Sequence, residues 1–161
     1  MTIQAGDRIP SVTIRQATTE GAKDVDPAAL FAGKRVVMFS LPGAFTSTCS
    51  TKHLPGYLAR HDEIKRSGVD LIACLSVNDA AVMQAWAAAH QVGDKIAMLA
   101  DGSALFTRAL GIENDLTARH MGIRARRGLF TIEDGVVRSI ELEQPGKFEV
   151  SSAEACLSKL V

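Results

Sequence analysis

Cys49 closes a turn that is rich in proline, glycine and hydroxyl residues and that leads from an apolar segment into a helical pattern. Residues 42–49 read Pro-Gly-Ala-Phe-Thr-Ser-Thr-Cys. In the first turn of a helix, unpaired backbone N–H groups and the positive end of the helix dipole stabilise a thiolate. The hydroxyl of Thr46, three residues earlier, can accept from the thiol or donate to a bound molecule. The segment therefore indicates a nucleophilic thiol, with a buried structural cysteine as the alternative.

Cys74 and Cys156 are the other two of the three cysteines, and the chain has no Cys-x-x-Cys pair. An odd number argues against a secreted disulfide framework, so each is interpreted as a free thiol in a reducing compartment. Cys74 lies in the apolar segment 71–75, which we expect to be a central strand. Cys156 shares an apolar helical face with Ala153 and Leu160. Both patterns predict core residues.

Cys49 and His53 are spaced i, i+4, which in isolation could place two metal ligands on one helical face. No complementary pair stands out, because His61, His90 and His120 are scattered. A Cys–His pair could also serve covalent hydrolysis, but no feature of the sequence requires a carbonyl substrate. We therefore expect no metal, and a His53 that forms hydrogen bonds or lines the rim of the site.

The charge balance narrows the choice of partners. The chain of 161 residues carries 18 lysines and arginines against 18 aspartates and glutamates, so it has no overall basic field for nucleic acid or anionic lipid. Residues 1–10 lack the pattern of a signal peptide, and no apolar run is long enough to span a membrane. We expect a soluble, cytoplasmic protein with one domain over residues 1–161, which binds neither nucleic acid nor membrane.

Apolar runs alternate with helical patterns along most of the chain, which is typical of βαβ units. In order, the patterns predict a strand at 36–40, a helix at 52–66, a strand at 71–77, a helix at 80–90, a strand at 96–100 and a short helix at 103–110. The composition of the strands indicates a sheet that is covered on both faces. An α/β sandwich follows.

The pattern changes near the end of the chain. Residues 128–132 and 136–142 flank a Glu-Asp-Gly turn whose last two residues tolerate positive φ, which predicts an antiparallel hairpin. Ser151 or Ser152 can then cap a last helix. No internal repeat, linker or low-complexity segment is evident.

The Cys49 segment resembles the signature of the peroxiredoxins. The spacing Pro42-x-x-x-Thr46-x-x-Cys49 and the following Cys-Ser-Thr-Lys-His-Leu-Pro-Gly are similar to the type II, or peroxiredoxin-five, subfamily, and so are residues 68–79 and 99–101. The resemblance covers nearly the whole chain. It implies a thioredoxin-like fold with an N-terminal β-hairpin and a central mixed sheet flanked by helices. It also implies reduction of hydrogen peroxide and organic hydroperoxides by the Cys49 thiolate, with no metal or organic cofactor.

The same resemblance assigns roles to residues around Cys49. Arg127, eight residues before Gly135, matches the arginine that peroxiredoxins bring to the thiolate from the strand before the terminal hairpin turn. Its guanidinium would hold the thiolate and stabilise charge on the peroxide oxygens. The remaining expected site residues are Pro42, which shields the thiol, Thr46, which orients the peroxide, and Gly43, Thr48 and Phe45, which contact the substrate. Trp86 and Phe130 could complete an apolar collar with Phe45.

One departure from the subfamily concerns the second cysteine. Some members carry a resolving cysteine after the terminal hairpin, but residues 147–152 here read Lys-Phe-Glu-Val-Ser-Ser. Cys74 is the alternative candidate for that role, because plant type II members have a cysteine at the matching place, although a central strand restricts the approach that a disulfide needs. We therefore expect external reduction by glutathione and glutaredoxin or by thioredoxin. The subfamily also implies a homodimer formed through loops near the active site. A thioredoxin-like binding or holdase module, or a redox sensor, remains the competing function class.

Overall fold

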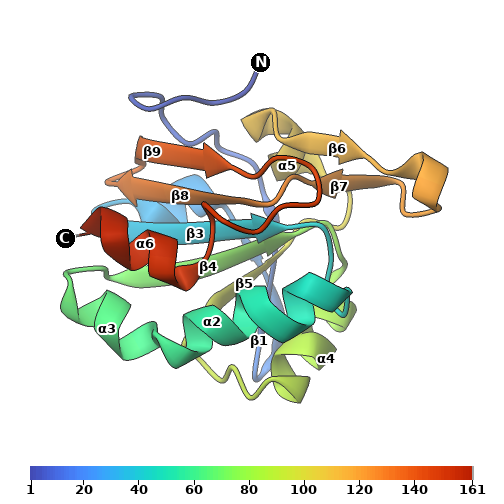
Figure 1. Cartoon of the computed structure of the whole chain (residues 1–161), viewed down its shortest axis with the longest axis horizontal. Helices are drawn as coiled ribbons and strands as arrows, with labels where there is room; N and C mark the ends of the chain where they lie inside the picture. Colours follow the sequence, from blue (N-terminus) through green and yellow to red (C-terminus); the bar gives the residue numbers. More distant parts are fainter. Residues whose placement is uncertain (161) are drawn as a thin grey trace.

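A seven-stranded mixed sheet forms the centre of the computed structural model, which describes residues 1–160 (Figure 1). Its order is β2-β1-β5-β4-β3-β8-β9, with β3, β4 and β5 parallel and the other neighbours antiparallel. The strands are β1 (Ile14–Thr18), β2 (Gly21–Val25), β3 (Arg35–Leu41), β4 (Leu71–Ser76), β5 (Ala97–Ala100), β8 (Gly128–Glu133) and β9 (Val136–Leu142).

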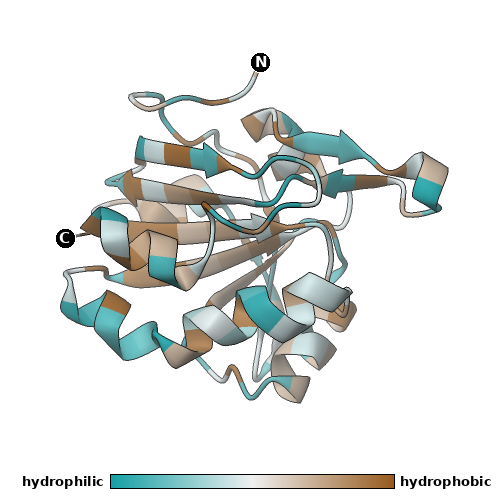
Figure 2. Cartoon of the chain, viewed as in Figure 1, coloured by the Kyte–Doolittle hydropathy of each residue, from teal (hydrophilic) through white to brown (hydrophobic). Residues whose placement is uncertain are grey.

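Helices cover both faces of this sheet. On one face lie η1 (Cys49–His53), α2 (Leu54–Ala59), α3 (His61–Arg66), α4 (Ala80–Ala89) and α6 (Ala153–Leu160), and on the other lie α1 (Pro27–Phe31) and α5 (Leu105–Leu110). Each face has its own buried apolar cluster. Figure 2 shows apolar residues along the central strands and polar residues on the outer sides of the helices. The predicted α/β fold with an N-terminal β-hairpin is confirmed.

The central strand β3 shows why its sequence is apolar throughout. Val37, Phe39 and Leu41 pack into the cluster below η1 and α2, whereas Val36 and Met38 pack into the opposite one. Successive side chains of a strand point to opposite faces, so a strand that is covered twice loses the alternation of polar and apolar residues.

The helix predicted at residues 52–66 is instead three consecutive segments. Residues 49–53 form a π-helical turn in which the N–H of Leu54 bonds to the carbonyl of Cys49, and Arg60 interrupts the helix again between α2 and α3. Pro55 has no N–H to continue the ordinary ladder, and this favours a local change of helical winding. The prediction of one continuous helix was therefore wrong, although helical structure does occupy these residues.

A two-stranded ribbon lies outside the main sheet and was not predicted. It pairs β6 (Glu113–Asp115) with β7 (Ile123–Ala125), around the short helix η2 (Thr117–Arg119). β6 is polar and β7 reads Ile-Arg-Ala, and three residues are too few for an alternation to stand out (Figure 2). The ribbon matters because β7 leads directly into Arg127.

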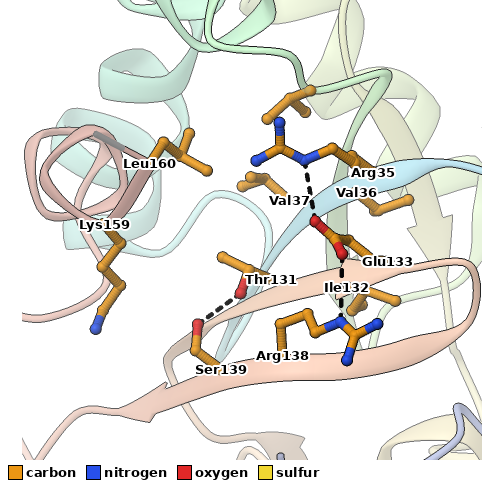
Figure 3. A pocket seen from close by; sticks show the side chains of 11 residues that line it. Arg35, Val36, Val37, Thr131, Ile132, Glu133, Arg138, Ser139, Lys159 and Leu160 are labelled. Atoms are coloured by element: carbon orange, nitrogen blue, oxygen red, sulfur yellow. Dashed lines mark hydrogen bonds and ion pairs between the residues drawn. The ribbon is translucent and has the colours of Figure 1, made fainter.

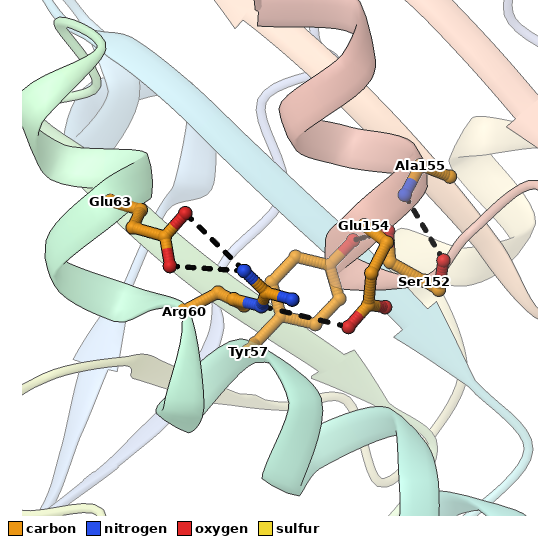
Figure 4. A network of polar contacts seen from close by, with 6 residues as sticks. All are labelled: Tyr57, Arg60, Glu63, Ser152, Glu154 and Ala155. Carbon is orange, nitrogen blue, oxygen red and sulfur yellow. Dashed lines mark hydrogen bonds and ion pairs between the residues drawn. The ribbon is translucent and has the colours of Figure 1, made fainter.

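The terminal hairpin and the last helix follow the sequence pattern. Asp134 and Gly135 have φ of 47° and 75°, as the predicted turn requires. Ser152 caps α6, accepting from the N–H of Ala155 at 3.1 Å (Figure 4). The Arg60 guanidinium joins the helix to its neighbours through Glu63 at 3.1 Å and Glu154 at 3.7 Å. Exposed pairs of this kind contribute about 0–1 kcal/mol each, so burial holds α6 in place.

Within residues 1–160, no helix is both long and apolar enough to cross a membrane.

Candidate active site

Cys49 lies where the chain turns from the carboxyl end of β3 into the π-helical turn η1. Its side chain is buried. The Arg127 guanidinium reaches it from the segment between β7 and β8, and Nη2 donates to the Cys49 sulfur at 3.1 Å. A guanidinium is charged at every physiological pH and cannot accept a hydrogen bond, so the sulfur must be the acceptor. The structure thus pairs this buried thiol with a permanent cation.

A buried histidine holds the same guanidinium from its other side. Nη1 of Arg127 lies 2.7 Å from Nδ1 of His53, and Nε2 of His53 lies 3.0 Å from the carbonyl oxygen of Ser151. Because arginine only donates, Nδ1 is unprotonated and Nε2–H donates to Ser151. Burial, and then the charge of Arg127, lower the pKa of His53 from 6.5 to about 3. His53 is therefore neutral, and it fixes the direction of Arg127 without competing for charge.

Glu143 organises the loop that supplies the Ser151 carbonyl. Its buried Oε2 accepts from the backbone N–H groups of Glu149, Val150 and Ser151 and from the Ser151 hydroxyl, at 2.7–2.9 Å. The Ser151 carbonyl also accepts from the Tyr57 hydroxyl at 2.8 Å. A chain of contacts thus runs from the Glu143 carboxylate through Ser151 and the neighbouring histidine to the arginine beside Cys49.

The turn before Cys49 is braced by the side chain of Arg124. Arg124 donates to the carbonyls of Pro42 at 3.4 Å and Val77 at 3.2 Å. A Cβ atom on Gly43 would lie only 2.8 Å from the Arg124 guanidinium, so the close approach depends on glycine at this position. Arg124 therefore supports the turn, whereas Arg127 contacts the thiol.

Thr46 has its hydroxyl proton engaged within the turn. Its Oγ1 donates to the carbonyl of Gly43 at 2.7 Å. The lone pairs of Oγ1 remain free to accept from a thiol or from the O–H of a bound molecule. The Thr46 hydroxyl was expected either to accept or to donate a hydrogen bond at the site. Because its proton is used in the bond to Gly43, it can act there only as an acceptor.

A cavity of about 470 Å³ opens beside the thiol, and we call it the mouth. Pro42, Thr46, Thr48 and Arg127, four of the expected site residues, line it. Cys49 itself is buried and is not part of the lining, but its sulfur accepts from Arg127, which is.

Two expected substrate contacts lie outside the mouth. Gly43 lies under Arg124, and Phe45 is 56% exposed, with its ring 6.5 Å from that of Trp86. Trp86 itself is buried, and its indole N–H donates to the Ser50 hydroxyl at 3.0 Å. Phe130 packs in the cluster on the opposite face of the sheet. The structure therefore does not bring these aromatic rings together as a collar around Cys49.

Cys74 and Cys156 are buried in the same cluster as Cys49 but have different surroundings. Burial raises the pKa of Cys74 well above its ordinary value and that of Cys156 to about 12. Cys74 lies within β4, paired with residues of β3 and β5. Both thiols are thereby kept protonated in the core.

The sequence did not point to Glu143, Ser151 or Phe148. Phe148 packs against the His53 ring at 5.0 Å between centroids and lies 5.8 Å from the Arg127 guanidinium carbon. An acidic residue two positions before Pro145 reads as an exposed turn residue, and a serine reads as a helix cap. Their contacts with the site arise from folding residues 143–151 back across η1.

No group of three or more His, Cys, Asp or Glu side chains in residues 1–160 is placed to hold a metal ion. The Cys49 and His53 side chains face Arg127 instead of a shared vacant point.

Known proteins share the sequence and the fold of this chain. Residues 4–157 match the Redoxin family. A peroxiredoxin-2E-2 of Oryza sativa subsp. japonica, described as chloroplastic, is 46% identical over 99% of this chain and 73% of its own length. Reduced Prx3 of Vibrio vulnificus, crystallised with H2O2, is 49% identical, with a TM-score of 0.94 over 99% of this chain and all of its own. A Plasmodium falciparum antioxidant protein, described as a 1-Cys peroxiredoxin, is 29% identical, with a TM-score of 0.92 over 98% of each chain.

These matches define the class as a thioredoxin-like peroxidase of the redoxin group. The chain belongs to the type II peroxiredoxins and is a thiol peroxidase that uses a hydroperoxide and a thiol reductant.

Proposed function

We propose that Cys49 is the peroxidatic residue and that it is oxidised to a sulfenic acid. The observation that carries the proposal is the Arg127 Nη2 donor, 3.1 Å from the Cys49 sulfur. The thiolate attacks one peroxide oxygen, so that an S–O bond forms while the O–O bond breaks. The sulfur is oxidised, and the other oxygen leaves with a proton as water or an alcohol.

The neighbouring groups divide the work of this step. Arg127 stabilises the negative charge that moves from sulfur to the leaving oxygen. The Thr46 hydroxyl, which donates to Gly43, accepts from the peroxide O–H and so orients it. Pro42 lines the mouth without a donor of its own to compete for the peroxide. The peroxide in the Vibrio vulnificus complex supports this choice of substrate.

The surroundings of the other cysteines support reduction by an external thiol. Cys74 and Cys156 are both buried, and residues 143–151 contain no cysteine. Attack of glutathione on the sulfenic acid would give a mixed disulfide and water, and glutaredoxin would then release the thiol. Thioredoxin is the alternative donor. The Plasmodium falciparum relative described as a 1-Cys peroxiredoxin supports a cycle with a single cysteine.

A turnover assay with defined reductants tests this function. The wild type should consume hydrogen peroxide with glutathione and glutaredoxin, or with thioredoxin and its reductase. Cys49→Ser should lose activity by more than about 10³-fold, because the nucleophile is gone. Cys74→Ala is the matched control at a buried thiol on the same face of the sheet. Normal turnover by Cys49→Ser would leave the holdase or sensor class in its place.

We also infer a homodimer that forms through the face around Phe45. This aromatic side chain is 56% exposed and has a left-handed backbone, with φ of 63°. A strained, exposed aromatic residue beside an active site is suited to contact with a second copy. Light scattering should give twice the chain mass for the wild type and the monomer mass for Phe45→Asp. A monomeric wild type would contradict the inference.

A further inference from the structure

The mouth beside Cys49 is positively charged although the chain as a whole has no net charge. Arg119, Arg126 and Lys147 line it together with Arg127. Among the described residues of its lining, only Glu143 is acidic. A concave site with one sign of charge concentrates ligands of the other sign.

Few acidic side chains of the protein pair with the cations that line the mouth. The Oε2 atom of Glu143 is occupied by donors of its own loop and forms no ion pair with an arginine. In residues 1–160, the half-buried Arg126 has a hydrogen-bonded backbone, but its guanidinium has no ion pair and no hydrogen-bond partner. Lys147 reaches only the exposed Glu149, at 3.9 Å. Arg126 therefore offers its fork of donors to a ligand.

A second cavity, of about 310 Å³, provides the contrast (Figure 3). It lies between α6 and the ends of β3, β8 and β9, and it too is lined by two arginines. There, however, Glu133 stands between them and forms an ion pair with Arg35 and with Arg138, at 3.3 Å each. That cavity holds its own counter-ion, whereas the mouth lacks one for Arg126.

The mouth also has an apolar wall. Leu116, Met121 and Phe148 contribute to it, and Phe148 packs against the His53 ring near the thiol. A ligand that satisfies the whole lining is amphipathic, with an anionic group and an apolar chain. A carboxylate suits arginine in particular, since two oxygens can take two parallel N–H groups.

We propose that the mouth binds organic hydroperoxides that carry a carboxylate, such as fatty-acid hydroperoxides. The carboxylate pairs with Arg126, the chain lies against Leu116 and Met121, and the peroxide reaches Cys49 past Thr46. The proposal rests on the peroxidatic role of Cys49 given above. Glutathione carries carboxylates as well, so the test must separate the oxidation half-reaction from the reduction half-reaction.

Single-turnover oxidation of pre-reduced enzyme, without any reductant, isolates the first half-reaction. Trp86 can report it by fluorescence, because its indole bonds to Ser50, next to Cys49. A fatty-acid hydroperoxide and its methyl ester, both kept below micelle-forming concentrations, differ only in charge. The wild type should oxidise about 10-fold faster with the acid, the size of one charge-assisted hydrogen bond.

Arg126→Gln should bring the ratio of acid to ester close to one. Arg138→Gln, an arginine of the second cavity, should keep the wild-type ratio. Higher salt should lower that ratio in the wild type, since the pair is partly exposed to solvent.

The outcomes separate this proposal from the one on which it rests. Failure of hydrogen peroxide to oxidise Cys49 would overturn the peroxidatic role itself. Fast oxidation by hydrogen peroxide with equal rates for acid and ester would overturn only the carboxylate site. An effect of Arg126→Gln confined to reduction by glutathione would also overturn it, in favour of a reductant site.

Discussion

Cys49 and Cys74 are both buried, on the same face of one sheet, yet their surroundings differ in kind. Cys74 lies in β4 between two paired strands, and burial keeps it a protonated core residue. Cys49 lies at a helix start, with the Arg127 guanidinium 3.1 Å from its sulfur. The difference lies in the donors that reach each sulfur, since both side chains have no exposed surface. Under the role proposed for Cys49, the charge beside a thiol is a better sign of its reactivity than its exposed surface.

The surroundings of the two cysteines also differ in how many layers of residues support them. Cys74 depends on packing alone, whereas the cation at Cys49 is held by His53, and His53 is held by the Ser151 carbonyl. The buried Glu143 carboxylate fixes that carbonyl in turn. The arginine beside Cys49 is therefore supported by a loop that lies about a hundred residues further along the chain. Three variants break that support at successive distances from the sulfur.

Arg127→Gln should produce the largest loss, because it removes the charge that distinguishes Cys49 from Cys74. We expect single-turnover oxidation by hydrogen peroxide to slow by about 10²–10³-fold, the effect of deleting one preorganised donor. Stopped-flow fluorescence measures it. Arg138→Gln, an exposed arginine paired with Glu133, is the control and should keep the wild-type rate. An unchanged rate for Arg127→Gln would remove the basis of the comparison.

Glu143→Gln should have a smaller effect, mainly on the loop. The variant keeps the size of the side chain but replaces a carboxylate that accepts four hydrogen bonds. We expect the free energy of unfolding in urea to fall by about 1–3 kcal/mol, with slower oxidation of Cys49. Glu149→Gln alters an exposed acid of the same loop and should stay within about 0.5 kcal/mol of the wild type. Equal stability of the two variants would show that the loop does not depend on Glu143.

The smallest expected effect is on the pH dependence of stability, which tests whether His53 is neutral in the folded protein. Its pKa is about 3 in the folded protein and 6.5 ordinarily, so it is neutral in both folded and unfolded states above pH 6.5. As the pH falls from 6.5 towards 3, the unfolded chain binds a proton that the folded one does not. The free energy of unfolding therefore falls, by at most about 1.4 kcal/mol per pH unit from this group.

Urea titrations at pH 7.0, 5.5 and 4.5, run on the wild type and on His53→Gln, measure that contribution. The wild type should lose more stability on acidification than the variant. Parallel curves would mean that His53 takes up its proton in the folded state, in conflict with its role as an acceptor for Arg127.

Local sequence was enough to predict the strand, turn and helix around Cys49, and also the apolar face of α6. The Cys49 segment and α6 each depend on residue spacing within about ten positions, where periodicity and turn chemistry act. The π-helical turn escaped prediction because its winding follows from one missing N–H, at Pro55. The β6–β7 ribbon escaped because strands of three residues are too short to carry a periodic pattern.

The supporting contacts of the site could not be predicted from the sequence for a different reason. Glu143 and Ser151 are ordinary in type and spacing, and they matter only because residues 143–151 cross over η1. Phe45 shows the converse case. Its place in the Cys49 segment suggested a substrate contact, but its side chain is largely exposed and does not line the mouth.

Mass spectrometry after a single equivalent of peroxide shows whether Cys49 alone is oxidised. Reduced protein is treated with hydrogen peroxide and a sulfenic-acid trap, and all three cysteines are mapped without reduction. We expect a stoichiometric adduct at Cys49, with Cys74 and Cys156 still as thiols. A stoichiometric disulfide between Cys49 and either of them, or an adduct at another cysteine, would contradict it.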